Sequence, residues 1–329
     1  MTVQITLIGT GRVGTSMGLA LSKETSQLFR VGHDRQPARS AAAQKMGALD
    51  KVHLNLHAAV KEADIVVLSI PVDEIYETLS LIAEDLKEGA VVLDTSLAKT
   101  TVTAWAGELL PDGVDFLTFA PTLNPACLLE TGSGPEAARA DLFEQSLTVI
   151  TSRGKISEAA LTLTSDLAVL LGSRPFFADP AEFEGLIAAS TLLPQVNAAA
   201  LLLATAGRTG WQEGRKVAGQ SFALAVQPLL LMNDHQKLGA SFLMNGDNLV
   251  RVIDNQIQGL QMLRGAVASR DEDGLQDMLE SVKDALQSWW DERNRANWDM
   301  DTGGPEIPSM GENLMHMIGL NPKKKKGKR

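Results

Sequence analysis

The sequence predicts an α/β fold in which a doubly wound parallel sheet is followed by an all-helical C-terminal domain. Short apolar runs alternate with amphipathic helical patterns through residue 151, and strand patterns mostly disappear after residue 157. The 329 residues are 44% hydrophobic and 21% charged, which is enough for two domains with buried cores. We therefore expect an α/β domain at 1–153, a helical domain at 154–300 and a loop-rich extension with a basic tail at 301–329.

A glycine-rich turn joins the first predicted strand to the first predicted helix. Apolar residues at 3, 5, 7 and 8 form the strand, and three glycines follow it at G-x-G-x-x-G spacing. Such a turn lets the backbone approach a pyrophosphate, and the helix N-terminus offers free N–H groups and positive dipole to it. This indicates a Rossmann-type dinucleotide-binding domain. The expected phosphate contacts are Gly9, Thr10, Gly11, Arg12, Val13 and Gly14.

The second strand, 28–32, leads to an acidic residue about 20 positions beyond the last glycine of the turn, where a carboxylate accepts hydrogen bonds from ribose hydroxyls. This residue is Asp34, and it favours NAD because a carboxylate repels the 2′-phosphate of NADP. The next residue, Arg35, keeps NADP possible as the cofactor, since its guanidinium would lie either on the adenine or against the 2′-phosphate. The strand at 64–71 brings Ile70 and Pro71 to the same crevice.

The remaining elements follow in order. Further strands are predicted at 90–94, 116–120 and 147–151, and helices at 15–22, 37–46, 58–62, 73–86 and 100–109. The second half contains helical patterns at 157–171, 179–204, 219–232 and 247–267, and a further apolar stripe from 275 to 289. These helices are too apolar to be solvated on all sides, which predicts a homodimer interface in the helical domain.

Composition excludes several classes of protein. The net charge is −10, although the last seven residues, 323–329, hold six basic side chains. The rest of the chain is therefore strongly acidic and repels nucleic acid, so only the basic tail would contact a nucleic acid. The single cysteine, Cys127, excludes an intramolecular disulfide and a cysteine-based metal site, and it fits a cytoplasmic protein. We expect no membrane-spanning run, no signal peptide and no bound metal.

Three later segments carry a family resemblance. They are DTSLAK at 94–99, FAPTLNP at 119–125 and DPAEFEGLIAASTLLPQ at 179–195. With the glycine turn, they make residues 3 to 295 similar to the prephenate/arogenate dehydrogenase family. The resemblance implies oxidation of a ring hydroxyl by hydride transfer to NAD or NADP, with loss of a ring carboxylate as carbon dioxide, in tyrosine biosynthesis.

The chain departs from this family at the positions that handle protons. Leu97 replaces a serine, Ala120 replaces a histidine before proline, and Gln195 replaces a histidine after a Leu-Pro pair. The resemblance leaves four candidate catalytic residues, which would hold a small-molecule carboxylate and its hydroxyl. They are Lys99, Asn124, Gln195 and Arg215.

Two other functions stay open at this stage. The substituted positions are compatible with a related dehydrogenase that oxidises a different hydroxy acid. They are also compatible with a catalytically inactive nucleotide-binding sensor or partner module, because alanine and leucine cannot take a proton.

Overall fold

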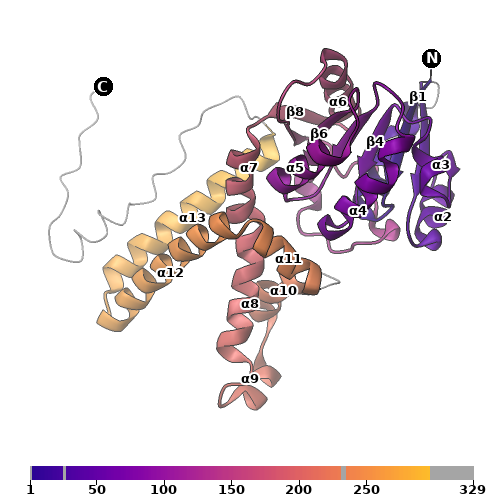
Figure 1. Ribbon diagram of the computed structural model, residues 1–329. Helices are drawn as coiled ribbons and strands as arrows, with labels where there is room; N and C mark the ends of the chain where they lie inside the picture. Colours follow the sequence, from indigo (N-terminus) through magenta and orange to yellow (C-terminus); the bar gives the residue numbers. More distant parts are fainter. Residues whose placement is uncertain (1, 25–26, 231–234, 297–329) are drawn as a thin grey trace. The chain divides into compact units, whose positions relative to one another are not determined.

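The computed structural model describes residues 2–24, 27–230 and 235–296 (Figure 1). The predicted extension at 301–329 lies outside these residues. The chain divides into two compact units, Met1–Asn255 and Gln256–Arg329, which we describe separately. The first unit holds the sheet and most of the helices, and the described part of the second unit consists of most of one long helix and the whole of another.

An eight-stranded sheet forms the centre of the first unit, in the order β3-β2-β1-β4-β5-β6-β7-β8. The strands are β1 (Val3–Ile8), β2 (Leu28–His33), β3 (Lys51–Val52), β4 (Ile65–Leu68), β5 (Val91–Asp94), β6 (Asp115–Pro121), β7 (Ser146–Thr151) and β8 (Ser173–Phe177). The strand order reverses between β1 and β4, so a crevice opens there at the carboxyl ends of the strands. The expected doubly wound α/β fold is confirmed.

Helices cover both faces of this sheet (Figure 1). They are α1 (Arg12–Ala20), α2 (Pro37–Lys45), α3 (Leu56–Val60), α4 (Val72–Ile82), α5 (Lys99–Leu109) and α6 (Glu158–Leu170). Alternate side chains of one strand enter different cores, because successive residues point to opposite faces. Val67 joins a cluster with α1 and α6, whereas Val66 and Leu68 join a cluster with α4 and α5.

The sheet departs from the sequence prediction in two respects. β7 is antiparallel to β6, with Phe119 opposite Ile150, so the sheet is not wholly parallel. The sheet also extends past the expected boundary at residue 153, because α6 returns the chain to β8, which pairs with β7 in parallel. The short β8 sequence, SRPFF, lacks the long apolar run that identified the other strands.

A long composite helix leaves the sheet. It comprises α7 (Pro180–Ile187), a π-helical segment (Ala188–Leu192) and α8 (Leu193–Thr205). Asp179 begins it by accepting hydrogen bonds from the backbone N–H groups of Ala181 and Glu182, as expected of an N-cap residue. Pro194 is tolerated because it stands in the first turn of α8.

This composite helix corrects one expectation. Residues Pro180–Thr205 are long and apolar enough to cross a membrane by length and composition, with a mean hydropathy of 1.7 over the most apolar window. One such helix is weak evidence of a membrane span. In this chain α7 packs against α5 of the nucleotide-binding part, and α8 packs against α10 (Gln220–Leu230). Only 22% of that window is buried, so much of the apolar surface of the helix stays exposed.

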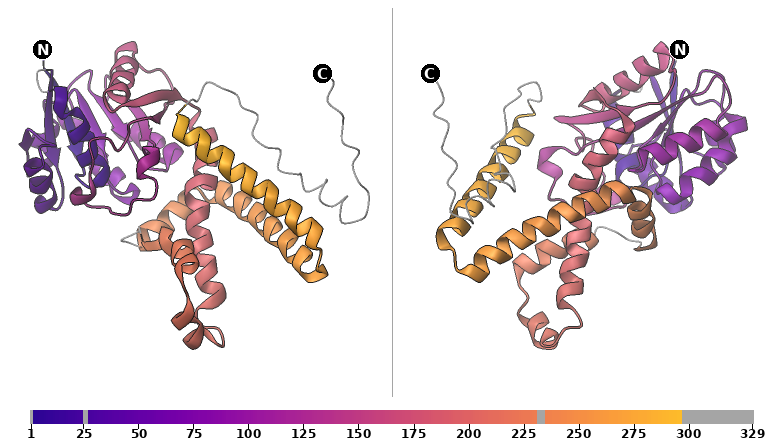
Figure 2. Two further views of the ribbon diagram at one scale, coloured as in Figure 1. Left: turned by 180° about the vertical axis from the view of Figure 1, so that it is seen from behind. Right: turned by 60° about the vertical axis from the view of Figure 1, so that its left-hand side comes forward.

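The helices α8 and α10 run side by side, with the short α9 (Trp211–Val217) at their far end (Figures 1 and 2). We call these three helices the helical arm. After the arm, α11 (His235–Met244) returns to α4. The sequence did not predict α9 or α11, because both are short and lack a regular apolar stripe.

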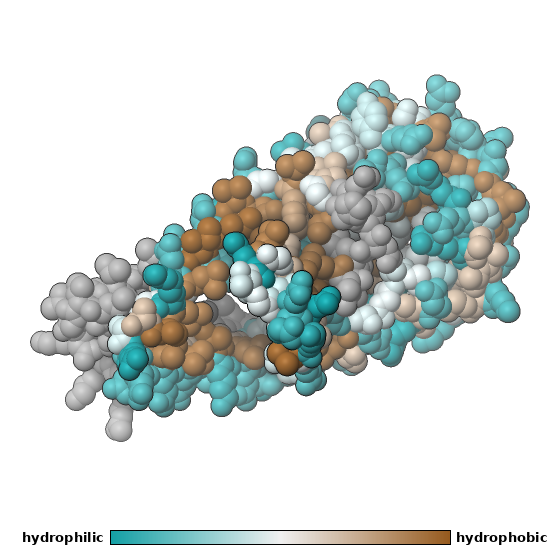
Figure 3. Space-filling model, turned by 90° about the horizontal axis from the view of Figure 1, so that it is seen from below, coloured by the Kyte–Doolittle hydropathy of each residue, from teal (hydrophilic) through white to brown (hydrophobic). Residues whose placement is uncertain are grey.

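The described part of the second unit comes from two long helices, α12 (Gly246–Ser269), whose first residues belong to the first unit, and α13 (Glu272–Arg295). Asp271 caps α13 through the backbone N–H of Gly274. Apolar side chains recur every three or four residues on both helices and remain exposed: Ile257, Leu260, Leu263, Val267, Leu279, Val282, Leu286 and Trp289. We call this set the hairpin face. Figure 3 shows exposed apolar side chains among hydrophilic ones on one face of the molecule.

Candidate active site

The glycine turn is built so tightly that two of its positions exclude any side chain. Gly9 has a φ of +92°, and a Cβ there would lie 2.2 Å from the carbonyl oxygen of Ser69. A Cβ on Gly14 would lie 2.1 Å from the carbonyl oxygen of Gly9. Gly11 is less constrained, since its Cβ would meet only the carbonyl oxygen of Ser133, at 3.3 Å. The turn therefore brings β1, α1 and the end of β4 together, as a pyrophosphate-binding turn requires.

A cleft of 1110 Å³ opens at the carboxyl ends of β1, β2 and β4. This volume is at the upper end of the range for ligand pockets, and it suits an extended ligand. Most of the predicted cofactor residues line it: Gly9, Gly11, Arg12, Val13, Asp34, Arg35, Ile70 and Pro71. Thr10 and Gly14 are buried and do not line it. The donor groups, the glycine cradle and the shape of the cleft fit a dinucleotide.

Asp34 connects the glycine turn to the end of β2. Its Oδ2 accepts hydrogen bonds from the backbone N–H of Thr10 (2.8 Å) and from the Thr10 hydroxyl (3.0 Å). Its Oδ1 accepts from the backbone N–H of Gln36 (2.8 Å). These bonds fix the carboxylate at the edge of the cleft, and each oxygen has two lone pairs in all, so Oδ1 retains capacity for a ligand hydroxyl.

A loop after β6 covers part of the glycine turn. The backbone N–H of Arg12 donates to the carbonyl oxygen of Ser133 (2.9 Å), and the Arg12 guanidinium lies 3.2 Å from the Glu130 carboxylate. Gly132 and Ser133 also line the cleft. Sequence reasoning missed this loop, and its only local signal is the run TGSG at 131–134.

A smaller cavity of 180 Å³ adjoins the cleft at the ends of β4 and β5. The two spaces share Ile70, Pro71, Val72 and Ser241 on their walls. The remaining wall of the small cavity comes from the segment after β5, from the π-helical segment and from the residue before α12: Ser96, Leu97, Ala98, Leu192 and Asn245. Ser241 and Asn245, one helical turn apart, were not anticipated from the sequence. The cavity is mainly apolar with a few polar groups, which is typical of a substrate site.

A buried polar cluster lies directly behind this cavity. The Ser96 hydroxyl donates to Asp94 Oδ2 (2.8 Å), and Lys99 Nζ lies 3.2 Å from the Asp94 carbonyl oxygen and 3.5 Å from Oδ2. The side chains of Asp94 and Lys99 are fully buried. Burial lowers the pKa of the Lys99 ammonium, and the Asp94 carboxylate opposes that shift. Ser96 therefore connects the cavity to a sequestered pair of opposite charges.

Glu184 joins the helical segment to this cluster. Its carboxylate accepts hydrogen bonds from the backbone N–H (2.7 Å) and the hydroxyl (2.8 Å) of Thr100, in the first turn of α5. A carboxylate at a helix N-terminus satisfies free N–H groups and complements the helix dipole. Asn245 in turn donates to the Glu184 carbonyl oxygen (2.9 Å). Glu184 is not among the candidate site residues predicted from the sequence.

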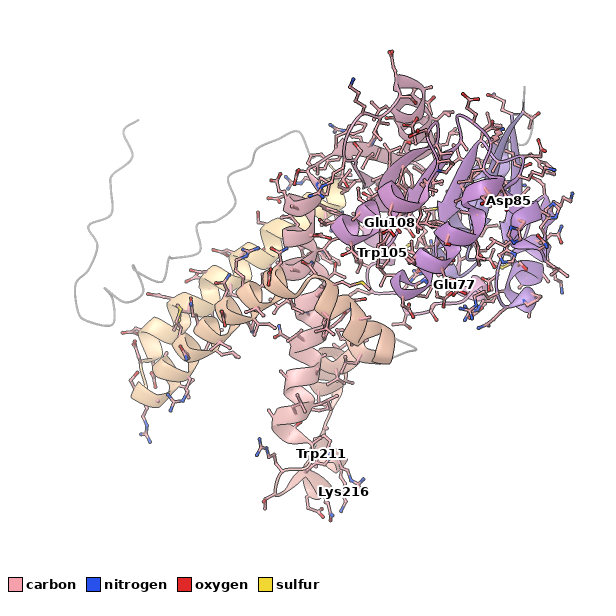
Figure 4. All side chains as sticks on the ribbon, in the orientation of Figure 1. Glu77, Asp85, Trp105, Glu108, Trp211 and Lys216 are labelled. Atoms are coloured by element: carbon pink, nitrogen blue, oxygen red, sulfur yellow. The ribbon has the colours of Figure 1, made fainter. Side chains whose placement is uncertain are left out.

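The four predicted catalytic residues do not all meet at the cavity. Lys99 lies behind it, and Gln195 lies one helical turn beyond Leu192, with its Oε1 buried and without a partner among the described residues. Asn124 uses its side chain within its own loop, donating to the Asp141 carbonyl oxygen and accepting from the Ala126 N–H. Arg215 is exposed on α9, at the far end of the helical arm, where Figure 4 labels its neighbours Trp211 and Lys216.

Metal ligands are not gathered anywhere in the part of the chain that the structure describes: no group of three or more His, Cys, Asp or Glu side chains there could hold a metal ion.

Comparison with known proteins gives a consistent result. Residues 17–175 match the family model described as prephenate dehydrogenase, nucleotide-binding domain. The cyclohexadienyl dehydrogenase of Zymomonas mobilis is 26% identical over 286 residues, which cover 86% of this chain and 94% of that protein. The prephenate dehydrogenase of Bacillus subtilis is 27% identical over 201 residues, and the chain spans about half of its length (52%).

Two solved structures share the fold. The prephenate dehydrogenase of A. aeolicus, solved in complex with hydroxyphenyl propionate and NAD+, is 21% identical and superposes with a TM-score of 0.75, over 86% of this chain and 96% of that one. The arogenate dehydrogenase of Synechocystis is 20% identical with a TM-score of 0.69, over 87% and 100% of the two chains.

The fold, the glycine cradle and the cleft define an NAD(P)-dependent dehydrogenase, an enzyme that acts on a small molecule. Residues 17–175 are thus similar to the nucleotide-binding domain of prephenate dehydrogenases, and 86% of the chain is similar to a cyclohexadienyl dehydrogenase.

Proposed function

We propose that the chain oxidises and decarboxylates prephenate or arogenate in tyrosine biosynthesis, with NAD as the preferred hydride acceptor. The observation that carries this proposal is the 180 Å³ cavity that adjoins the dinucleotide cleft, because it provides a place for a ring beside the reacting end of the cofactor. The relative that matches over most of its length carries the name cyclohexadienyl dehydrogenase, which supports the same substrate class. Bound NAD would supply the acceptor for the hydride.

The residues around the cavity can take up the hydroxyl proton without a histidine. Ser96 lines the cavity and already donates its own proton to Asp94, so it can accept the substrate proton as it passes its own to the carboxylate. Lys99 holds that carboxylate in place from the other side. Once the ring hydroxyl has become a carbonyl, loss of the ring carboxylate as carbon dioxide leaves its bonding electrons in an aromatic ring.

Gln195 and Asn124 are assigned different parts. The buried, unpartnered Oε1 of Gln195 supports a role as acceptor for a ligand hydroxyl or amine, since a buried acceptor without a partner is costly. Asn124 shapes the loop after β6 and is assigned a positioning role, because its amide is engaged by Asp141 and Ala126.

The substrate carboxylate would be held by Arg215, supplied by a second copy of the chain. Arg215 lies on α9 at the far end of the helical arm and lines neither cavity of its own chain. The exposed apolar surfaces of α8 and of the hairpin face support a homodimer, in which an arm can reach the partner's cavity. A cytoplasmic location is supported by the one free, buried cysteine.

The test is an initial-rate assay with prephenate and arogenate, each with NAD and NADP, beside a direct cofactor titration. We expect NAD reduction with at least one acid, and we expect Ser96→Ala to lower kcat by about 10²-fold or more with little change in the Kd for NAD. The matched control is Ser190→Ala, in the π-helical segment, because this exposed serine donates its hydroxyl to the Leu186 carbonyl oxygen and does not line the cavity. Tight NAD binding without turnover of either acid would contradict the proposed substrate.

A further inference from the structure

We propose that Glu74, on α4, is a specificity-determining residue that biases the cofactor cleft against the 2′-phosphate of NADP. This inference rests on the proposed dinucleotide-dependent function. It concerns the adenosine end of the cleft, where α4 faces the segment that follows β2, and it involves none of the residues assigned to proton transfer.

Charged side chains face each other across this end of the cleft. Arg35 and Arg39 line it from the β2 side, and Glu74 and Glu77 line it from α4. Arg35 Nη1 lies 3.3 Å from Glu74 Oε2. The Arg35 side chain is 74% exposed, whereas that of Glu74 is only 20% exposed. The carboxylate is therefore the sheltered member of the pair, and the guanidinium is the member that is open to solvent.

Asp34 is not the whole basis for cofactor choice. Its position after β2 is where a carboxylate meets the ribose hydroxyls, yet its oxygens already accept three hydrogen bonds from Thr10 and Gln36. Beside it stand two arginines, the residue type that best binds a phosphate. With these two arginines and without Glu74, the cleft would be suited to the 2′-phosphate of NADP.

Glu74 reverses that balance in two ways. Its ion pair engages one of the two guanidinium groups, so that this group would have to leave a carboxylate to reach a phosphate. It also places a second negative charge on the wall opposite Asp34, which repels a 2′-phosphate but has little effect on a ribose hydroxyl. Preference for NAD over NADP thus arises because the Glu74 carboxylate repels the 2′-phosphate and because its ion pair with Arg35 keeps that guanidinium from binding the phosphate.

The inference is tested by measuring the Kd of NAD and of NADP by calorimetry, without substrate or turnover. Relative to wild type, Glu74→Gln should raise the affinity for NADP about two- to fivefold and leave that for NAD nearly unchanged, as expected for a partly exposed charge pair. Two variants are matched controls. Asp73→Asn removes a charge from the same helical turn but outside the cleft, and Glu77→Gln removes one from the cleft wall that is not paired with Arg35.

Arg35→Gln provides a second, independent readout. In the wild-type background it should change the NADP affinity by less than about twofold, because Glu74 already engages Arg35. In the Glu74→Gln background it should remove the gained NADP affinity, which shows as coupling in a double-mutant cycle.

Three results would overturn this inference and leave the proposed function standing. They are an unchanged ratio of the NADP and NAD Kd values in Glu74→Gln, an equal change of that ratio in Glu77→Gln or Asp73→Asn, or additive effects of Glu74→Gln and Arg35→Gln on the NADP Kd. Wild-type protein that binds neither dinucleotide would instead contradict the proposed function itself. Circular dichroism of each variant confirms that the fold is intact. If Glu74→Gln folds poorly, a clear loss of NADP affinity in Arg35→Gln alone would still overturn the inference, because it would show that Arg35 is available to the 2′-phosphate despite Glu74.

Discussion

At the scale of single residues, the glycine turn makes the most stringent demand on the sequence. Gly14 packs against the carbonyl of Gly9 so closely that a methyl group has no space. The sequence predicted a role for all three glycines of the motif, but the structure ranks them: Gly9 and Gly14 are obligatory for packing, whereas Gly11 has more room. A sequence pattern specifies spacing but does not show which backbone atoms come close.

We predict that Gly14→Ala reduces dinucleotide affinity by at least about tenfold, because the added methyl group forces the turn apart. Gly107→Ala is the control, since a Cβ at that helical position meets nothing within 4 Å and alanine favours a helix. A calorimetric titration with NAD measures both variants. Equal, wild-type affinity in the two would contradict the assigned phosphate site.

A second residue-scale prediction concerns the ion pair of Arg30 and Asp50. Arg30 is buried, donates to Asp50 Oδ1 at 2.7 Å and also donates to the carbonyl oxygens of Gly18 and Gly47 (both 2.8 Å). Burial acts to raise the pKa of Asp50, but the Arg30 hydrogen bonds and charge outweigh it and leave this pKa below its ordinary value of 3.8. Asp50→Asn should therefore lower the free energy of unfolding by about 3 kcal/mol at pH 7, because it leaves a buried guanidinium unpaired.

The sign of the pH dependence follows from the lowered pKa. The unfolded state binds the Asp50 proton more readily than the folded state, so the stabilisation is complete well above pH 3.8 and is lost as the pH falls through the folded-state value. Urea titrations of wild type and Asp50→Asn should thus converge below pH 3.8 and stay parallel from pH 5 to 8. Asp112→Asn, at an exposed position, should show no such difference. A gap that widens in acid would contradict the assignment.

At the scale of elements, most strands and long helices could be predicted, because buried strands are short apolar runs and the helices have clear stripes. The antiparallel direction of β7, the pairing of β8 with the sheet and the π-helical segment could not, since pairing direction and helix type depend on contacts distant in sequence. The same limit applies to the site. Asp34 and the glycine turn are local signals, but Ser241 and Asn245 reach the cavity only through tertiary structure.

The contact of α7 with α5 gives an element-scale prediction. Glu184→Gln weakens the cap on α5 and removes a charge near Lys99, so we expect a loss of about 1–3 kcal/mol in unfolding free energy. Glu182→Gln is the matched control, since Glu182 lies on the same helix but is exposed. Chemical denaturation measures both. Similar effects in the two variants would show that the Glu184 cap contributes nothing specific.

At the scale of the whole molecule, the exposed apolar side chains of the helical arm and of the hairpin face are the strongest indication of self-association. Introducing charge there should separate a homodimer, because an unpaired carboxylate in an apolar interface is strongly disfavoured. We predict that Leu263→Asp combined with Leu286→Asp, both on the hairpin face, yields monomers in sedimentation velocity at micromolar concentration. Glu280→Asn, at an exposed polar position of α13, should remain associated.

A wild-type protein that is monomeric at these concentrations would contradict the dimer. It would also remove the proposed route by which Arg215 of a second copy reaches the cavity. In a dimer, Arg215→Ala should raise the KM for the acid by about tenfold or more and leave NAD affinity unchanged, because its part is to hold a substrate carboxylate.

The most direct test of the central claim is the stoichiometry of the reaction. Purified protein is incubated with NAD and with prephenate or arogenate labelled in the ring carboxylate, and the reduced cofactor and the released carbon dioxide are measured together. The account predicts one equivalent of each per molecule of acid consumed, with a hydroxyphenyl product. Reduction of NAD without carbon dioxide release, or no reduction by a sample shown to bind NAD, would contradict it.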